Sequence, residues 1–91
     1  MTNDSPKVSV IIPHWNGIEI ISECLDSLAK TQFESYEVIV SDNASTDGSK
    51  KWLKENHPEV RLLENSKNYG YAGGCNRGSE IARGTFLLFL N

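Results

Sequence analysis

The chain has 91 residues, which suits one small domain, and its apolar (38%), charged (23%) and aromatic (9%) contents are ordinary for a soluble globular protein. A net charge of −3 with nine scattered Lys and Arg residues argues against a nucleic-acid binder, which would carry a basic patch. The longest apolar run, FLLFL, is too short to span a bilayer, and the start, MTNDSPK, lacks the pattern of a signal peptide. We therefore expect a cytoplasmic protein whose two cysteines, Cys24 and Cys75, remain reduced.

Apolar runs alternate with helical patterns along the chain. After a disordered tail over residues 1–6, short runs of β-branched and other apolar residues predict strands, at 8–12, 36–41, 60–64 and 85–90. Pro13 is expected to end the first strand. A helix follows it, predicted by apolar residues at helical spacing, namely Ile18, Ile21, Leu25 and Leu28.

The other two predicted helices have different signals. Thr46 or Ser45 is expected to cap the second helix, which His57 and Pro58 end. The third helix follows a glycine-rich stretch, and we expect it to lie unusually close to its support. Its predicted buried face consists only of small side chains, those of Ala72, Cys75, Ser79 and Ala82.

The order β-α-β-α-β-α-β, with strands that are apolar runs, predicts a mostly parallel four-stranded sheet covered by helices on both faces. The fold class is therefore α/β, a Rossmann-like three-layer sandwich over residues 7–91. The last strand reaches Asn91 at its ligand-facing end. Because natural domains rarely end there, we expect a domain truncated at its C-terminus.

Ligands of open parallel sheets bind beyond the carboxyl ends of the strands, where this chain has polar segments at 13–17, 41–49 and 64–78. Asp42 is the strongest single candidate for ligand binding, because its carboxylate could accept hydrogen bonds from a base or a ribose. The alternative is that Asp42 and Asp47 only turn the chain and cap a helix. We favour the ligand role for Asp42 and the cap for Asp47, which precedes Gly48.

The glycine-rich segment GYAGGCNRG matches neither a dinucleotide-binding motif nor a P-loop. It would let the backbone approach an anion before a helix, or let that helix pack tightly on the sheet. Arg77 could reach a phosphate or lie in solvent. His14 could line the pocket, where Trp15 and either Tyr69 or Tyr71 would stack on a base or else pack the loops together.

Taken together, VSVIIPHWNG, VIVSDNASTDGS, NYGYAGGCNRGSEIARG and FLLFLN resemble the start of family 2 glycosyltransferases, above all the bacterial rhamnosyltransferase-type members. The resemblance covers residues 7–91, with four segments in the right order. It implies the N-terminal, nucleotide-sugar-binding half of a GT-A fold. The implied partners are a UDP- or TDP-sugar donor and a saccharide or lipid-linked acceptor, with Mn²⁺ or Mg²⁺ as the cofactor of the full-length enzyme.

The resemblance also implies which residues bind the donor nucleotide: Pro13, His14, Trp15, Asn16, Asp42, Asn68, Gly70, Asn76 and Arg77. Position 14 departs from the family, where many members have Thr, Ser or Val.

The family's metal-binding motif and catalytic base are expected beyond Asn91, and Glu64 is expected at the sheet edge, away from the phosphates. This chain alone should therefore bind no metal and transfer no sugar, and its uncovered last strand should favour self-association. Whether the full-length protein is peripheral to the cytoplasmic membrane stays open. A non-catalytic nucleotide-binding or interaction module on the same fold is the alternative function.

Overall fold

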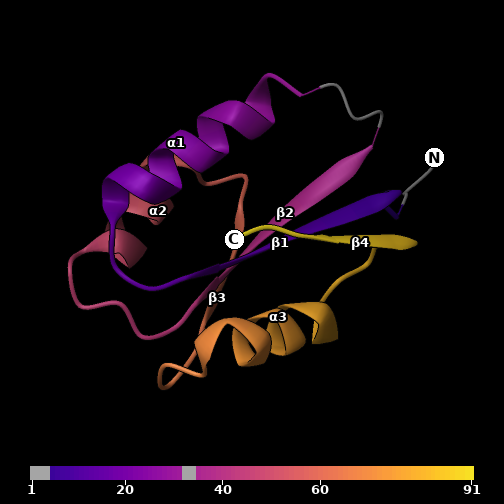
Figure 1. The fold of residues 1–91 in the computed structure, drawn as a ribbon. Coiled ribbons are helices and arrows are strands. Elements are labelled where there is room, and N and C mark those ends of the chain that lie inside the picture. Colours follow the sequence, from indigo (N-terminus) through magenta and orange to yellow (C-terminus); the bar gives the residue numbers. More distant parts are fainter. Residues whose placement is uncertain (1–4, 32–34) are drawn as a thin grey trace.

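The computed structural model describes residues 5–31 and 35–91, so residues 1–4 of the predicted tail lie outside it. Strands and helices alternate as predicted (Figure 1). They are β1 (Val8–His14), α1 (Ile18–Ala29), β2 (Tyr36–Asp42), α2 (Ser49–Asn56), β3 (Arg61–Glu64), α3 (Gly70–Glu80) and β4 (Phe86–Phe89). No helix within the described ranges combines the length and the apolar character that a membrane crossing requires.

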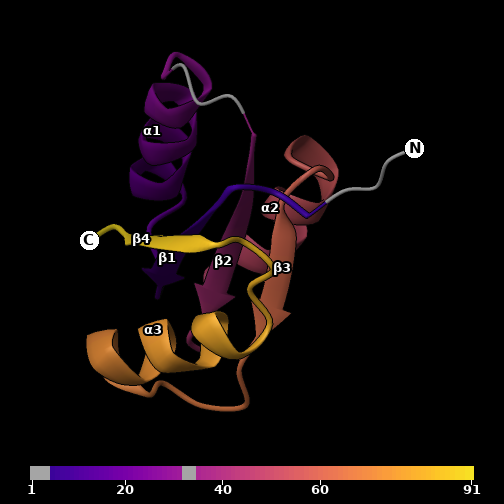
Figure 2. The ribbon, with the colours of Figure 1, turned by 90° about the vertical axis from the view of Figure 1, so that its right-hand side faces the viewer.

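The strands form one parallel sheet in the order β3-β2-β1-β4 (Figure 2). The chain moves outward from β1 through β2 to β3, and then returns to place β4 on the other side of β1. The strand order therefore reverses beside β1, and ligands of such sheets bind at the carboxyl end of that position. The edge position predicted for the strand that ends in Glu64 is confirmed.

The helices cover both faces of the sheet, α1 and α2 on one side and α3 on the other (Figure 1). Alternate residues of β1 and β2 point to the α1 and α2 side, and they build the main apolar core with the helices. This core consists of Val10, Ile12, Ile21, Leu25, Leu28, Val40 and Leu53. The apolar face predicted for the first helix is confirmed for three of its four residues, while Ile18 is half-buried.

Helix α3 packs on β1 so closely that glycines form the contact. A Cβ added at Gly78 would lie 2.6 Å from Cγ2 of Ile11, and one at Gly74 would lie 3.0 Å from Cβ of Pro13. The close approach predicted for this helix is thus present, but the predicted residues need correction. The buried residues are Gly74, Cys75 and Gly78. Ala72 is exposed, Ser79 is half-buried and Ala82 follows the end of the helix.

Two further predictions about local structure are wrong. Strand β1 continues through Pro13 to His14. Pro13 is tolerated because pairing with β4 ends earlier, at Ile11 and Phe89, so no neighbouring strand uses its missing N–H. The N-terminus of α2 is at Gly48, whose φ is 89°, and neither Ser45 nor Thr46 caps it.

A carboxylate fixes the connection between α3 and β4. Glu37 accepts hydrogen bonds from the Ser9 hydroxyl (2.6 Å), the Arg83 backbone N–H (2.7 Å) and Nη1 of Arg61 (2.9 Å). Burial acts to raise the pKa of Glu37, but these hydrogen bonds and the charge of Arg61 together lower it. Arg61 also donates to the carbonyl of Ile81, at 2.7 Å. The network therefore holds residues 81–84 against three strands.

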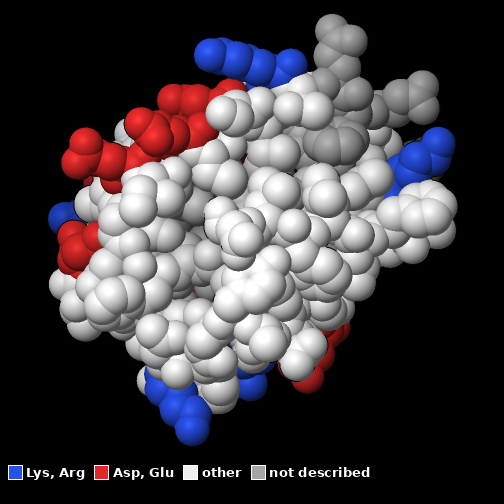
Figure 3. Space-filling view, viewed as in Figure 1, with Lys and Arg blue, Asp and Glu red and all other residues white. Residues whose placement is uncertain are grey.

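Strand β4 is an exposed edge of the sheet, in agreement with the uncovered last strand that the sequence analysis predicts. Its residues are between 37% and 61% exposed. A hollow of about 460 Å³ separates this strand from α1, lined in part by Cys24, Leu28 and Leu88. Figure 3 shows a centre without charged side chains on this face, with acidic side chains gathered over α1.

Candidate functional site

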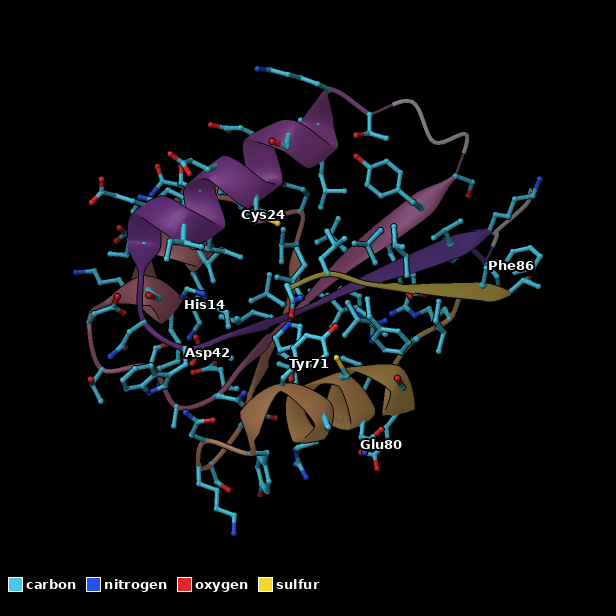
Figure 4. All side chains as sticks on the ribbon, in the orientation of Figure 1. His14, Cys24, Asp42, Tyr71, Glu80 and Phe86 are labelled. Atoms are coloured by element: carbon cyan, nitrogen blue, oxygen red, sulfur yellow. The ribbon has the colours of Figure 1, made fainter. Side chains whose placement is uncertain are left out.

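Three of the predicted polar segments meet at the carboxyl end of β1. They surround a hollow of about 240 Å³, which we call the loop hollow; it is lined by Pro13, His14, Trp15, Asn43, Asn68, Gly70 and Tyr71. Figure 4 shows His14 and Asp42 at the ends of β1 and β2 and Tyr71 rising from α3, while Glu80 and Phe86 lie toward the other end of the molecule. Five of the nine predicted nucleotide-binding residues therefore line one hollow.

Asn16 joins the two loops that follow β1 and β2. Its backbone N–H donates to the Ser45 hydroxyl at 2.8 Å, and its side-chain oxygen accepts from the Thr46 N–H at 2.8 Å. Its φ of 49° lies in the left-handed region, which asparagine tolerates better than most residues. Asn16 thus shapes the rim of the site from outside the loop hollow.

Asp42 is fully buried. One carboxylate oxygen accepts from the Ser45 N–H at 2.8 Å, and the other accepts from the Ser45 hydroxyl at 2.7 Å. The structure therefore displays the turn-forming role that was the alternative for this residue. A contact between Asp42 and a ligand stays a prediction, and because Asp42 is fully buried it would require the residues that cover the carboxylate to move.

Asp47 ties together the N-termini of two helices. It accepts hydrogen bonds from the Gly17 N–H (2.6 Å), from the Ser49 N–H (3.0 Å) and from the Ser49 hydroxyl. These bonds, the one from the Ser49 hydroxyl first, lower the pKa of Asp47 from 3.8 to about 2. A carboxylate at a helix N-terminus also interacts favourably with the helix dipole. The structural role predicted for Asp47 is confirmed, and it extends to α1.

His14 is 6% exposed, and its Nε2 lies 3.1 Å from the Ser49 hydroxyl oxygen. Burial lowers the pKa of His14, although the charges of Asp42 and Asp47 act to raise it. The imidazole is therefore neutral at neutral pH. The sequence predicted that His14 could line the pocket, and His14 is among the residues that line the loop hollow. The structure also shows its hydrogen bond to Ser49, the first residue of α2.

The sequence did not identify two buried asparagines that support the loop hollow. Asn43 and Asn65 are each 4% exposed and share a hydrogen bond of 2.9 Å. Asn43 also donates to the Gly70 carbonyl at 3.1 Å, and Asn65 donates to the Ser41 hydroxyl at 2.9 Å. One signal was available, since Asn65 directly follows a predicted strand and Asn43 follows the end of another by two residues. The partners could not be inferred, because they depend on how β2 and β3 align.

Arg77 belongs to the same network. Its Nε donates to Asn65 at 2.9 Å, and its guanidinium carbon lies 4.7 Å from the Tyr69 ring centre. No residue in the described ranges bonds its terminal nitrogens. Tyr69 thus packs on Arg77, and Tyr71 is the tyrosine of the loop hollow.

The two remaining predicted residues are both exposed: Asn68 lies in the loop before α3, and Asn76 lies on α3. Asn68 accepts from the Gly70 N–H at 2.8 Å, at the start of α3 where Gly70 has a φ of 76°. Asn76 is exposed on α3 and does not line the loop hollow.

The described residues do not fit a metal centre. They contain no group of three or more His, Cys, Asp or Glu side chains that could hold an ion. The carboxylates of Asp42 and Asp47 already accept hydrogen bonds from Ser45, Gly17 and Ser49.

Known proteins resemble this chain in sequence and in fold. It is 38% identical over 91 residues to a poly(ribitol-phosphate) beta-glucosyltransferase of Bacillus spizizenii, which covers 93% of this chain and 14% of that protein. Residues 1–349 of TarS from S. aureus match with a TM-score of 0.80 and 34% identity, over 92% of this chain and 26% of that chain. The same TarS segment was also solved in complex with UDP-GlcNAc.

A third similar protein is the mannosyltransferase PcManGT from Pyrobaculum calidifontis, solved with GDP-Man and Mn²⁺. It matches with a TM-score of 0.71 and 32% identity, over 87% of this chain and 25% of that chain. The chain spans between 14% and 35% of the length of the curated relatives that we compared. The fold is the Rossmann-like α/β arrangement of GT-A glycosyltransferases.

A sequence model described as "Glycosyl transferase family 2" matches residues 9–91, which is nearly the whole chain. With the parallel sheet and the converging loops, this match identifies the chain as a member of glycosyl transferase family 2.

Proposed function

We propose that residues 7–91 form the donor-binding part of a glycosyltransferase that uses a UDP- or TDP-sugar and transfers the sugar to a glycan, a lipid or another acceptor. The observation that carries this proposal is the loop hollow. Polar segments from three parts of the chain line it, beside the strand where the sheet order reverses. The UDP-GlcNAc complex of TarS and the GDP-Man complex of PcManGT support a nucleotide-sugar as the ligand class.

The residues fit two parts of such a donor. Trp15 and Tyr71 offer aromatic surfaces for the base, at the wall of the loop hollow. Arg77 is the cation that we assign to the diphosphate, because Asn65 and Tyr69 hold it in place while its terminal nitrogens are unbonded in the described part of the chain. Asp42 remains the residue proposed to bind the base or ribose.

We also propose that this chain alone transfers no sugar. A divalent cation normally stabilises the leaving diphosphate of such a donor, and PcManGT was solved with Mn²⁺. We propose that an acidic metal-binding motif and the catalytic base of the full-length enzyme are separate from the residues described, which contain no group of three or more His, Cys, Asp or Glu side chains that could hold an ion. The assay is release of nucleoside diphosphate from UDP- and TDP-sugars with Mn²⁺. Metal-dependent turnover by the 91-residue chain would contradict this part of the proposal.

Titration of isotope-labelled protein with UDP, TDP and GDP tests donor binding directly. We expect backbone amide shifts at residues 14–16, 42–47 and 68–78, with a dissociation constant in the millimolar range, roughly −4 kcal/mol, because the metal is missing. Adding Mg²⁺ should change the affinity little for the same reason. Shifts confined to the Glu37 network, at the opposite end of the sheet, would contradict the proposed site.

A further inference from the structure

Trp15 lies between two residues whose backbones are bonded to the loop after β2. It lines the loop hollow and is 54% exposed. Before it, the carbonyl of His14 accepts from the Asn43 N–H at 2.7 Å. After it, the N–H of Asn16 donates to the Ser45 hydroxyl at 2.8 Å. The backbone of this exposed aromatic residue is therefore anchored on both sides.

The register of the sheet brings the two loops together. His14 and Asp42 end β1 and β2 and are partners in the parallel register. Figure 4 shows both residues at this end of the sheet. The loops that follow them consequently leave the sheet side by side, and polar groups of one loop reach the backbone of the other.

Ser45 supplies the second anchor through its side chain. The Asn16 N–H can only donate, so the Ser45 oxygen accepts from it, and the single hydroxyl hydrogen of Ser45 is donated to Asp42 at 2.7 Å. The Ser45 N–H donates to the other oxygen of the same carboxylate at 2.8 Å. Ser45 is 6% exposed and Asp42 is fully buried, so these bonds are strengthened by their low-dielectric surroundings.

Asn16 needs this support because its backbone is strained. Its φ of 49° lies in the left-handed region, which is costly for a residue with a side chain. Such a conformation persists only where neighbouring groups enforce it. Two bonds of 2.8 Å do so here, one from the Asn16 N–H to the Ser45 hydroxyl and one from the Thr46 N–H to the Asn16 side-chain oxygen. Loss of the first bond should let residues 15 and 16 relax.

We propose that Ser45 is a positioning residue for the donor site: it holds Asn16, and thereby keeps Trp15 where the indole stacks on the base. This inference rests on the proposed function of the loop hollow as a nucleotide site. Trp15 is the residue that touches the base, while Ser45 acts only through the loop. A residue that is ordered before binding loses less conformational entropy when the ligand arrives, so the ligand binds more tightly.

Ser9 offers a matched control for Ser45. It is fully buried, its hydroxyl donates to the Glu37 carboxylate at 2.6 Å, and its oxygen accepts from the Gly84 N–H at 2.8 Å. The two serines thus have the same kinds of partner at opposite ends of the sheet. Ser9→Ala removes an equivalent pair of hydrogen bonds without touching the loops around Trp15.

The first experiment measures order in the free protein by NMR. In the unmodified chain, the Asn16 N–H should be protected from exchange with solvent, because its acceptor is buried. Ser45→Ala should lower the amide heteronuclear NOE at Trp15 and Asn16 but not in the strands, whereas Ser9→Ala should leave Trp15 and Asn16 unchanged. Rapid exchange of the Asn16 N–H in the unmodified chain, or unchanged order at Trp15 in Ser45→Ala, would overturn the proposal. The exchange measurement decides even if Ser45→Ala fails to fold.

The second experiment measures the dissociation constant of UDP in a double-mutant cycle. Trp15→Ala should weaken binding about tenfold, the effect of one stacked base. Ser45→Ala should weaken it about fivefold while Trp15 is present, the effect of ordering one side chain. In the Trp15→Ala background it should weaken binding little further, because Ser45 acts through Trp15. Ser9→Ala should bind like the unmodified chain.

Two outcomes of the cycle separate this inference from the proposed function. Equal losses from Ser45→Ala with and without Trp15 would show that Ser45 acts on another part of the donor, which overturns the inference and leaves the proposed function intact. Absence of UDP binding by the unmodified chain would overturn the proposed function and the inference with it.

Discussion

Asp42 and Asp47 belong to the same loop, and each acts on the loop through backbone N–H groups. The buried Asp42 carboxylate accepts from Ser45, whereas the exposed Asp47 carboxylate connects Gly17 with Ser49. The pKa of Asp47 is lowered from 3.8 to about 2, so the folded state binds its proton less tightly than the unfolded state. Its contribution to stability is therefore present above pH 3.8 and is lost as the pH falls toward 2.

His14 also makes the stability of the fold depend on pH, and here too the stability decreases as the pH falls. Its pKa is lowered below 6.5, mainly by burial, so the unfolded state takes up the proton first as the pH falls. The stability contributed by neutral His14 is complete above pH 6.5 and decreases below it. The loss of stability due to His14 thus begins below pH 6.5, and the loss due to Asp47 begins below pH 3.8.

Replacing Asp47 by alanine should destabilise the fold. We expect a loss of about 1–2 kcal/mol at neutral pH, because two helix N-termini lose an acceptor. The difference between Asp47→Ala and the unmodified protein should shrink as the pH falls from 3.8 to 2. Urea unfolding at several pH values measures both effects. Glu23→Ala, on the exposed side of α1, is the control and should change little. Equal midpoints for both variants at neutral pH would contradict the assigned role.

For individual residues, the sequence predicted which ones lie near the site better than it predicted their hydrogen-bond partners. The resemblance to family 2 glycosyltransferases implied that Pro13, His14, Trp15, Asn68 and Gly70 belong to one site, and all five line the loop hollow. The sequence did not predict that Asn65 would hold Arg77 through a hydrogen bond. That bond depends on the alignment of β3 with β2 and on the packing of α3, which are properties of the folded chain.

Among the elements, α3 shows how a pattern of small residues can mislead. The spacing of Ala72, Cys75, Ser79 and Ala82 is helical, but glycines contribute no side chain to such a pattern. The sheet is so close that a methyl group at Gly78 would lie 2.6 Å from Ile11. The helix therefore turns its glycines toward β1, and the alanine at its start faces solvent.

A matched pair of substitutions tests this orientation of α3. Cys75→Leu should destabilise by roughly 1–3 kcal/mol, because Cys75 is buried and a larger side chain would overpack this position. Ala72→Leu should change stability by less than about 0.5 kcal/mol, because the position is exposed. Thermal or urea unfolding measures both. A larger loss of stability for Ala72→Leu than for Cys75→Leu would show that Ala72 is buried, as the sequence predicted.

For the molecule as a whole, the sequence predicted the order of the elements, the parallel sheet and the uncovered edge of the last strand, although the apolar residues of that strand alone indicate burial. Alternation of strands and helices requires crossovers, and short right-handed crossovers lead to a parallel sheet covered on both faces. An apolar strand has the same sequence whether or not a neighbour covers it. The structure shows β4 at the edge of the sheet, with Phe86 61% exposed and no charged side chain across the centre of that face (Figure 3).

The exposed edge leads to the prediction that this chain associates with itself at high concentration. The N–H groups of Phe86 and Leu90 donate to Lys7 and Ile11 on the β1 side, so Leu87 and Phe89 direct their backbone groups outward. An apolar edge strand with open backbone groups pairs readily with another chain, and lysine on the edge prevents it. We expect concentration-dependent sedimentation of the unmodified protein and monomers for the double variant Leu87→Lys with Phe89→Lys.

The control for this experiment should remove an exposed apolar side chain elsewhere. Ile20 is 68% exposed on α1, so Ile20→Lys also replaces an exposed apolar side chain by lysine, but without touching β4. We expect this variant to associate like the unmodified protein, because the open backbone groups of Leu87 and Phe89 remain. If Ile20→Lys abolished association and the β4 variant did not, the contact would lie on α1, and the edge strand would have no part in it.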